Sequence, residues 1–502
     1  MTPCKPLLIA LLAATLASGQ TARTTDLARE IPKELAASAQ ARQAFWGIQI
    51  VDLASGRTLY ELNPSKLFVP ASNTKLFTGA LALSRLGGAF TFQTRVMAAA
   101  GPDAGGRIRG PLILLGGGDP NLSGRTFPYK PDAPPGYPLA AIEDLAAQIA
   151  AHGVKSVEGG IIGDDSHYVW EPYPEGWAVD DPLYEYGAPV SALSVNDNMF
   201  SLRVAPGAKA GDPAAVTPHP PVEYYAIENR IVTRAAAAEG RVSSERDPGS
   251  LQLRLWGGVP VGGPVRTLEF GIEDPARFAA LALRNALTAR GVAVAGEIAA
   301  RHLYRSDAPQ PGKQASSAAE PAGVELARRT SVPLLDDLRL TLKASVNLHA
   351  EMALRAVGRE RQGVGSLEAG LEEMRLFLGE TGIDKDSVNL NDGSGLTRLN
   401  LVSPAATVKL LRHMYDSPQR DDWVSILAVG GEDGTLIGRL GGAAQGRIFA
   451  KTGTLSHASA ISGYARRRSG GMLVFSILVN NYSDSSSAIR GVIDRICTLI
   501  VE

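Results

Sequence analysis

The alternation of apolar and polar residues changes character along this 502-residue chain. Residues 45–64 hold two alternating runs split by Ala-Ser-Gly-Arg, which predicts a β-hairpin after a helix over 26–43. From 332 to 415 apolar residues recur at intervals of three and four, which predicts a block of helices. Residues 446–481 alternate again and predict a meander of strands. This order predicts one α/β domain whose antiparallel sheet both ends of the chain complete.

Residues 98–319 differ in composition and in the length of their apolar runs. Loops rich in Pro, Gly and Ala separate short apolar runs there, so we expect a β-rich insertion with two nested subdomains. The last of these loops, at 306–323, reads as the linker back to the main domain. The main domain is thus predicted to consist of residues 20–97 and 320–502.

The first residues have the features of a secretory signal. Lys5 precedes an apolar run from Leu7 to Leu16, and small residues follow it, so we expect a signal peptide over 1–19 with cleavage near Gly19. That run is too short to span a bilayer, and no later segment is apolar enough. We therefore expect an exported protein, soluble or loosely membrane-associated, with no integral membrane segment after cleavage.

Charge and metal-ligand spacing narrow the function classes. With 50 basic and 51 acidic residues, the chain gives no electrostatic case for a nucleic-acid partner. Its seven histidines show no paired metal spacing, so we expect no metal and no cofactor. Loss of Cys4 with the leader would leave Cys497 alone, which excludes an intramolecular disulfide.

Candidate chemistry begins at Ser72 and Lys75, within Pro-Ala-Ser-Asn-Thr-Lys. Residues three apart on a helix share a face, so the hydroxyl and the amine can reach each other. A capping serine beside a solvated lysine is the common interpretation of such a pair. Here Leu76, Phe77 and Leu81 surround the lysine, and desolvation would lower its pKa until it could accept the serine proton.

Two further patterns supply partners. Lys451-Thr452-Gly453 lies on a predicted strand, where a glycine is favoured if another backbone must come close. Ser-Val-Asn occurs at 194, 345 and 387. Only the copy at Ser345 and Asn347 falls between two predicted helices of the main domain, so we select it and interpret the other two as turns.

Together, Ser-x-x-Lys, Ser-x-Asn and Lys-Thr-Gly in this order resemble the penicillin-recognising serine enzymes. The spacing of 273 residues from Ser72 to Ser345, with an insertion between them, is similar to that of the class C low-molecular-mass penicillin-binding proteins, which are D-alanyl-D-alanine carboxypeptidases and endopeptidases. Three more segments resemble this family, namely Gly-Gly-Gly-Asp-Pro-Asn-Leu at 116–122, Pro-Val-Ser-Ala-Leu-Ser-Val-Asn-Asp-Asn at 189–198, and the stretch from Asn-Asp-Gly-Ser-Gly-Leu at 391–396 to Pro404.

The resemblance implies a transpeptidase/β-lactamase-like fold and a periplasmic enzyme that acts on peptidoglycan stem peptides, with β-lactam antibiotics as covalent inhibitors. It implies that Ser72 forms an acyl-enzyme and that its catalytic partners are Lys75, Ser345, Asn347 and Lys451. It also implies substrate contacts by Thr452, Gly453 and Thr454, with the Thr454 backbone N–H in the oxyanion hole. Asp164 aligns with an insertion aspartate that faces the diamino acid of the stem peptide in that family.

Two alternatives stay open at this point. A β-lactamase would share Ser72, Lys75 and Lys451, but the Glu-x-x-Leu-Asn motif of class A enzymes is absent and the insertion is long. A non-catalytic protein that binds cell-wall peptide or penicillin would be expected to have lost a catalytic residue, and none is lost. The sequence does not separate carboxypeptidase from endopeptidase activity, and it leaves the oligomeric state open.

Overall fold

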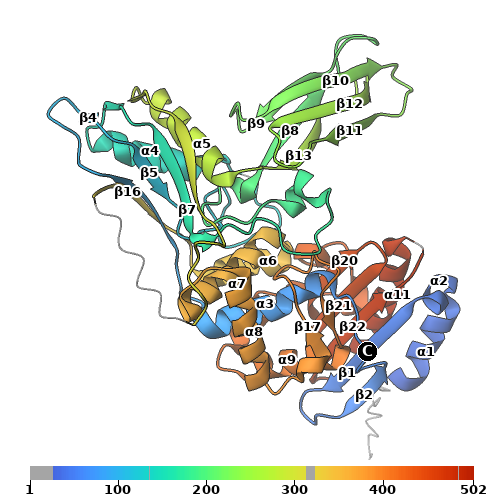
Figure 1. Ribbon diagram of the computed structural model, residues 1–502. Helices are drawn as coiled ribbons and strands as arrows, with labels where there is room; N and C mark the ends of the chain where they lie inside the picture. Colours follow the sequence, from blue (N-terminus) through green and yellow to red (C-terminus); the bar gives the residue numbers. More distant parts are fainter. Residues whose placement is uncertain (1–25, 135, 313–322, 484) are drawn as a thin grey trace, which may run out of the picture.

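The computed structural model describes residues 26–134, 136–312, 323–483 and 485–502 (Figure 1). The predicted leader over 1–19, and with it Cys4, lies outside the described residues, as does part of the predicted linker at 306–323. In the part of the chain that is described, the ribbon forms three lobes: a large lower one and two smaller ones above it (Figure 1).

A six-stranded antiparallel sheet forms the centre of the large lobe, in the order β19-β20-β21-β22-β1-β2. The N-terminal hairpin and the C-terminal meander meet where β1 pairs with β22 along its whole length, from Phe45 opposite Asn480 to Asp52 opposite Leu473. This confirms the prediction that both ends of the chain complete one sheet. The strands are β1 (Phe45–Asp52), β2 (Thr58–Leu62), β19 (Ala428–Val429), β20 (Ile448–Leu455), β21 (Ala458–Arg466) and β22 (Met472–Asn480).

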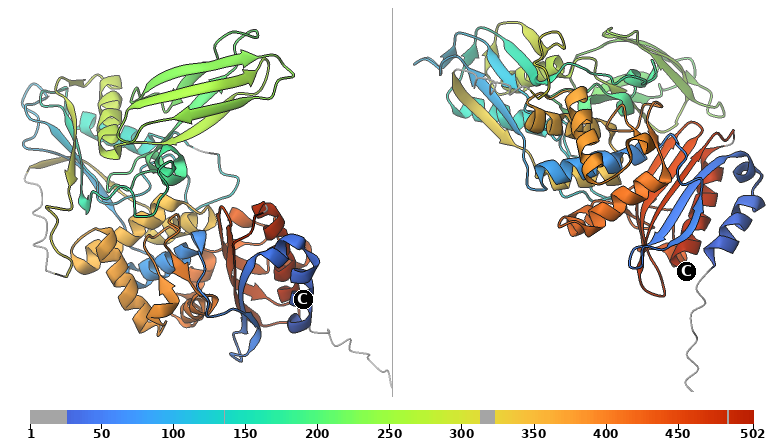
Figure 2. Two further views of the ribbon diagram at one scale, coloured as in Figure 1. Left: turned by 45° about the vertical axis from the view of Figure 1, so that its right-hand side comes forward. Right: turned by 60° about the horizontal axis from the view of Figure 1, so that its bottom comes forward.

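Helices cover both faces of this sheet, as the two further views show (Figure 2). On β22, Phe475 and Ile477 join the core under α11 and α1, while Val474 and Leu478 join the core on the other face, with α9 and α3. A strand buried on both faces favours continuous apolar residues, which explains why β22 does not alternate. The covering helices on the first face are α1 (Leu27–Ala37), α2 (Ala39–Gln43) and α11 (Ser486–Val501). The single helix expected over 26–43 is therefore split at Ser38, whose extended backbone ends α1 and whose hydroxyl accepts from the Ala41 N–H.

The helical block predicted over 332–415 packs on the second face. The helix α3 runs through its middle and is buried from Thr74 to Leu83, because α6, α7, α8 and α9 all contact it. The helices are α3 (Thr74–Leu86), α6 (Leu334–Lys343), α7 (Asn347–Gln362), α8 (Leu367–Glu380), α9 (Pro404–Asp416) and α10 (Arg420–Ser425), with the short ribbon β17 (Val388–Asn389) and β18 (Leu401–Val402) beside them.

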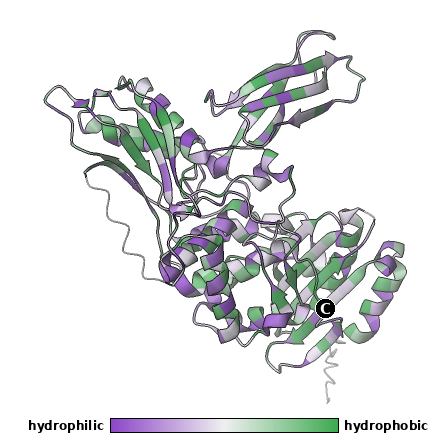
Figure 3. Cartoon of the chain, in the orientation of Figure 1, coloured by the Kyte–Doolittle hydropathy of each residue, from purple (hydrophilic) through white to green (hydrophobic). Residues whose placement is uncertain are grey.

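One smaller lobe holds a five-stranded mixed sheet in the order β15-β7-β5-β3-β16. The helices α4 and α5 pack on it and supply much of an apolar core, which appears as green strands in Figure 3. The strands are β3 (Gln93–Ala98), β5 (Leu112–Leu115), β7 (Ile161–Val169), β15 (Ile298–Leu303) and β16 (Val324–Thr330), with α4 (Ala140–Ala151), α5 (Pro275–Ala289) and a small sheet of β4 (Arg107–Ile108), β6 (Ser156–Val157) and β14 (Ala293–Val294).

The other smaller lobe consists of two three-stranded sheets that project from the first (Figure 1). They are β13-β8-β9 and β10-β12-β11, with bounds β8 (Met199–Ala205), β9 (Ala215–His219), β10 (Ala226–Arg234), β11 (Arg241–Glu245), β12 (Gln252–Pro260) and β13 (Arg266–Gly271). Short 3₁₀ turns connect many elements of the chain: η1 (Ala71–Asn73), η2 (Asp181–Leu183), η3 (Glu185–Gly187), η4 (Asn196–Asn198), η5 (Lys385–Ser387), η6 (Gly434–Leu436) and η7 (Gly442–Ala444).

The junctions between the main domain and the insertion differ from the predicted positions at 97/98 and 319/320. Strand β3 pairs with β16 and with β5, so Gln93–Ala98 lies wholly in the sheet of the insertion, as does Val324–Thr330. Sequence alternation identifies a strand but does not identify its partner, which is why both junctions were placed too far toward the interior of the insertion.

Candidate active site

Ser72 lies in the 3₁₀ turn η1 that leads into the buried helix α3, and Lys75 lies on the first turn of that helix. The Lys75 Nζ is 2.9 Å from the Ser72 Oγ and donates to it. Ala71, directly before Ser72 in this turn, has a left-handed backbone with a φ of +49°. The sequence therefore places the hydroxyl and the amine in direct contact, as their spacing predicted.

Lys75 is fully buried, and burial lowers the pKa of its ammonium to about 7, although Asp392 and Glu351 oppose the shift. Its Nζ also donates to the Asn347 Oδ1 at 2.6 Å and to the Ser394 carbonyl at 2.7 Å. A lysine with this pKa is partly neutral near pH 7, and a neutral amine has a lone pair for the Ser72 proton.

Ser345 and Lys451 form the second pair of the site. Ser345 lies between α6 and α7 with a φ of +66°, a strained value for a residue other than glycine. The Lys451 Nζ, from β20, donates to the Ser345 Oγ at 2.8 Å and to the Thr452 carbonyl at 2.8 Å. Burial, and then the charge of Lys75, lower the pKa of Lys451.

Asn347 begins α7 and connects the insertion to Lys75. Its side-chain oxygen accepts from Lys75, and its amide nitrogen donates to the Tyr186 carbonyl at 2.9 Å. The other two Ser-Val-Asn copies lie elsewhere: Ser194 is buried in the insertion ahead of η4, and Ser387 ends η5.

Gly453 and Gly395 allow two segments to touch the Ser72 turn. A Cβ on Gly453 would lie 2.7 Å from the Pro70 carbonyl oxygen and 3.0 Å from the Ser72 nitrogen. A Cβ on Gly395, which has a φ of +84°, would lie 1.9 Å from the Ala71 carbonyl oxygen. The backbone that comes close to Gly453 is thus the turn that carries Ser72.

A cavity of about 370 Å³ opens beside Ser72. Asn347 and Thr454 line it together with Tyr186, Asp181 and Arg398. Thr452 is almost buried, and its hydroxyl donates to the Thr435 Oγ1 at 2.7 Å. Of the two threonines around Gly453, Thr454 is therefore the one on the cavity wall.

The structure does not bring Asp164 to this cavity. Asp164 lies on β7, pairs with Arg301 at 3.0 Å, and accepts from the backbone and hydroxyl of Ser166. The family resemblance points to Asp164, whereas the aspartate that lines the cavity beside Ser72 is Asp181. Asp181 comes shortly before the segment 189–198, which resembles the family. This closeness in sequence was the signal that could have identified Asp181 as a residue of the site.

The loop at 391–396, which the sequence showed only as a segment resembling the family, is part of the surroundings of Lys75. The buried Glu351 accepts from the backbone N–H of Gly393 and of Ser394, and this fixes the Ser394 carbonyl that Lys75 contacts. Asp392 accepts from the Gly395 N–H and from the indole N–H of Trp177. The loop is thus held from α7 and from the insertion.

Among the described residues, no group of three or more His, Cys, Asp or Glu side chains is arranged to hold a metal ion. No helix in the same set of residues has the length and apolar character needed to cross a membrane.

The fold and this set of side chains are those of a serine-type acyl-transfer peptidase. A model of the family described as "D-Ala-D-Ala carboxypeptidase 3 (S13) family" matches residues 27–499, and the chain belongs to this family. The match confirms the resemblance drawn from the motifs. The chain therefore belongs to the enzyme class of the serine-type D-Ala-D-Ala carboxypeptidases.

Relatives of known sequence and structure agree with this placement. A D-alanyl-D-alanine carboxypeptidase from Actinomadura sp. (strain R39) is 34% identical over 493 residues, which cover 96% of this chain and 86% of that protein. The crystal structure of penicillin binding protein 4 (dacB) from Haemophilus influenzae matches 93% of this chain and 97% of its own with a TM-score of 0.76 at 21% identity. A structure of the same Haemophilus protein with a β-lactam matches with a TM-score of 0.71, also at 21% identity. At that identity the two structures support the fold, and they confirm the predicted fold class.

Proposed function

We propose that this D-Ala-D-Ala carboxypeptidase uses Ser72 as its nucleophile and acts on peptidoglycan stem peptides in the periplasm. We extend the proposal to cross-linked stem peptides, which would make the enzyme an endopeptidase as well. The observation that carries the assignment is the 2.9 Å contact between the Ser72 Oγ and a buried Lys75 whose pKa is about 7.

In the first step, the Ser72 Oγ attacks the carbonyl carbon of the bond between the two D-alanines and Lys75 accepts its proton. The proton that Lys75 has taken is relayed to the departing amine through Ser345, which Lys451 holds, so free D-alanine leaves, an ester to Ser72 remains and both lysines recover their starting protonation. Water then hydrolyses the ester. In a cross-link the departing amine belongs to the neighbouring peptide, and the same steps apply.

The backbone N–H groups of Ser72 and Thr454 form the proposed oxyanion hole. Removing one such donor costs about 3–4 kcal/mol of barrier. The close approach of Gly453 to Pro70 and Ser72 supports this assignment, because it holds β20 against the turn and so fixes the spacing of the two donors. Asp181 and Arg398 give the cavity wall one charge of each sign, which suits the amine and the carboxylate of a stem peptide.

The test is the intact mass of the full chain after incubation with a penicillin, followed over hours. We expect wild type to gain one penicillin and Ser72→Ala to gain none. Ser84→Ala, on the same helix, is the matched control and should behave as wild type. A peptide that ends in D-Ala-D-Ala should then release D-alanine with wild type and with the control only.

Three outcomes would contradict the proposal. Rapid hydrolysis of penicillin without a lasting adduct would favour a β-lactamase. A lasting adduct without turnover of any D-Ala-D-Ala peptide would favour a penicillin-binding protein without peptidase activity. An adduct on Ser72→Ala would mean that another residue is the nucleophile.

A further inference from the structure

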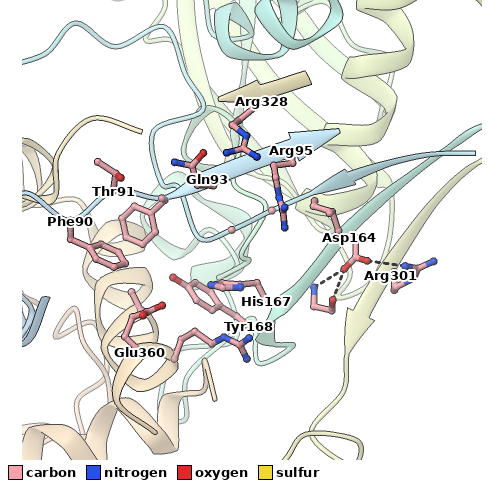
Figure 4. Close-up of a pocket in the computed structure, with 17 residues that line it drawn as sticks. Phe90, Thr91, Gln93, Arg95, Asp164, His167, Tyr168, Arg301, Arg328 and Glu360 are labelled. Atoms are coloured by element: carbon pink, nitrogen blue, oxygen red, sulfur yellow. Dashed lines mark hydrogen bonds and ion pairs between the residues drawn. The ribbon is translucent and has the colours of Figure 1, made fainter. Parts of the chain in front are cut away.

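A second cavity, larger than the one beside Ser72, lies where the insertion meets α7 (Figure 4). Its volume is about 680 Å³. Strands β3, β5, β7, β15 and β16 of the five-stranded sheet contribute to its wall, and Arg359 and Glu360 of α7 complete it. Ser72 and the residues around it do not line this cavity, so the catalytic steps leave it without a role.

The wall of this cavity carries an excess of positive charge. Four guanidinium groups line it, and two carboxylates, Asp164 and Glu360, oppose them; the arginines are Arg95, Arg301, Arg328 and Arg359. Each guanidinium can bind a carboxylate through two parallel hydrogen bonds. Asp164 and Glu325 already pair with Arg301 and Arg328, so the excess is small and the cavity favours an anionic group such as a carboxylate.

Two of the arginines are held in place by acidic side chains. Asp164 pairs with Arg301 at 3.0 Å and is itself fixed by Ser166 at 2.6 Å. Glu325 accepts two hydrogen bonds from Arg328, at 2.7 and 2.8 Å. A guanidinium that is already positioned loses less side-chain freedom when a ligand binds.

The partly buried His167 reports the same electrostatic environment. Burial, and to a smaller extent the positive charges of Arg359 and Arg95, lower its pKa to about 4. His167 is therefore neutral near pH 7 and adds no charge. Its ring lies in the same cavity wall as Arg95 and Glu360 (Figure 4).

Apolar surface completes the wall on the side of α3. Phe90 and Phe92 lie edge to face with ring centroids 5.1 Å apart, and the ring of Tyr168 also faces the cavity. Charged groups next to aromatic surface suit an organic anion with hydrocarbon parts better than a small inorganic one.

We propose that this cavity binds a second, uncleaved stem peptide of peptidoglycan through its free carboxylates. The inference rests on the proposed function only in naming peptidoglycan as the source of the ligand. Glu360 and the aromatic wall favour a peptide over a phosphate polymer, since a stem peptide carries an amine and hydrocarbon for them to contact as well as carboxylates for the arginines. A site away from Ser72 would hold the enzyme on its insoluble substrate between cleavages.

Titration calorimetry of the full chain with a stem tripeptide tests this, because the tripeptide keeps its carboxylates and lacks the D-Ala-D-Ala bond. We expect the double variant of Arg95→Gln with Arg359→Gln to weaken binding about tenfold or more. Arg203→Gln, an exposed arginine on β8 outside the cavity, is the matched control and should bind as wild type. Amidation of the peptide carboxylates should weaken binding by a similar factor.

Measuring the penicillin acylation of each variant distinguishes a failure of the second binding site from a failure of the proposed function at Ser72. Wild-type acylation of the double variant would show that it is folded; if it fails to fold, Arg301→Gln, whose side chain is 51% exposed, takes its place. Tripeptide binding that is unchanged in the arginine variants, or that is lost in Arg398→Gln at the Ser72 cavity instead, would overturn the assignment. Inorganic phosphate that binds more tightly than the tripeptide and depends on the same arginines would also overturn it, in favour of a phosphate-bearing ligand. A failure of acylation in wild type would overturn the proposed function alone.

Discussion

The surroundings of Lys75 lower the pKa of its ammonium, as its proposed role as a base requires. Its neighbours along α3 are buried, and its three hydrogen-bond acceptors come from three different segments of the chain. A lysine with the same spacing on an exposed helix would keep a pKa of about 10.4.

The rate of penicillin acylation should follow the titration of Lys75. Only the neutral amine accepts a proton, so the rate should rise as pH increases toward about 7 and level off above it. Lys75→Arg keeps a permanent charge and should lower the rate by about 10² to 10⁴ without this dependence. Stopped-flow acylation across pH measures both, with the exposed Lys66→Arg as control. A wild-type rate that does not change with pH would argue against Lys75 as the base.

Ser345 combines a hydroxyl that Lys451 contacts with a strained backbone. Both Ser345→Ala and Ser345→Gly remove the hydroxyl that Lys451 contacts, so acylation should fall in both. Only glycine adopts a φ of +66° readily, so the glycine variant should be more stable than the alanine variant by about 1 kcal/mol. Urea unfolding compares them, and equal stabilities would mean that the strain at this position is negligible.

At the scale of elements, the site depends on how closely β20 approaches the turn η1. Gly453→Ala should separate the two, because its Cβ would meet backbone atoms that cannot rotate away. We expect a loss of about 1–3 kcal/mol in stability and slower acylation. Gly441→Ala is the matched control, since nothing lies within 4 Å of its added Cβ. Equal effects of the two substitutions on acylation would contradict the role given to Gly453.

Sequence patterns predicted which segments are strands and helices better than they predicted contacts between them. The hairpin, the helical block and the meander follow from local periodicity, and the Ser72, Ser345 and Lys451 motifs follow from short spacings. The strand that pairs with β3 and the cavity that Asp164 lines are both set by contacts between segments far apart in the sequence. The local pattern of residues in a single sequence does not indicate such contacts. Asp181 and Tyr186 reach the site by the same kind of contact, and were missed for that reason.

At the scale of the whole molecule, a buried charged network joins the insertion to the catalytic lobe. His349 of α7 contacts Asp337 of α6 at 2.7 Å and Asp197 of the insertion at 3.2 Å, and Arg125 pairs with Asp197. Asp119 is the other buried acid nearby, and burial raises its pKa to about 6. Burial alone would lower the pKa of His349, but the two carboxylates raise it to about 9.

This network predicts how stability depends on pH. The folded pKa of His349, about 9, lies above its unfolded value of about 6.5, so its contribution is fully present below the lower value and is lost as pH rises through about 9. Wild type should therefore lose melting temperature between about pH 7 and 10 more steeply than His349→Gln. Calorimetry across that range measures both, and parallel curves would mean that His349 is neutral in the folded protein.

The pairing of β1 with β22 also sets an order of events. Besides its hairpin partner β2, the strand β1 that precedes Ser72 pairs with β22, whose residues come more than 400 positions later. A chain that emerges from its N-terminus therefore carries Ser72, the proposed nucleophile, long before the sheet behind it can close. Until the C-terminus arrives, β20 cannot be held against the Ser72 turn, so an unfinished or truncated chain would carry the motif without being able to use it.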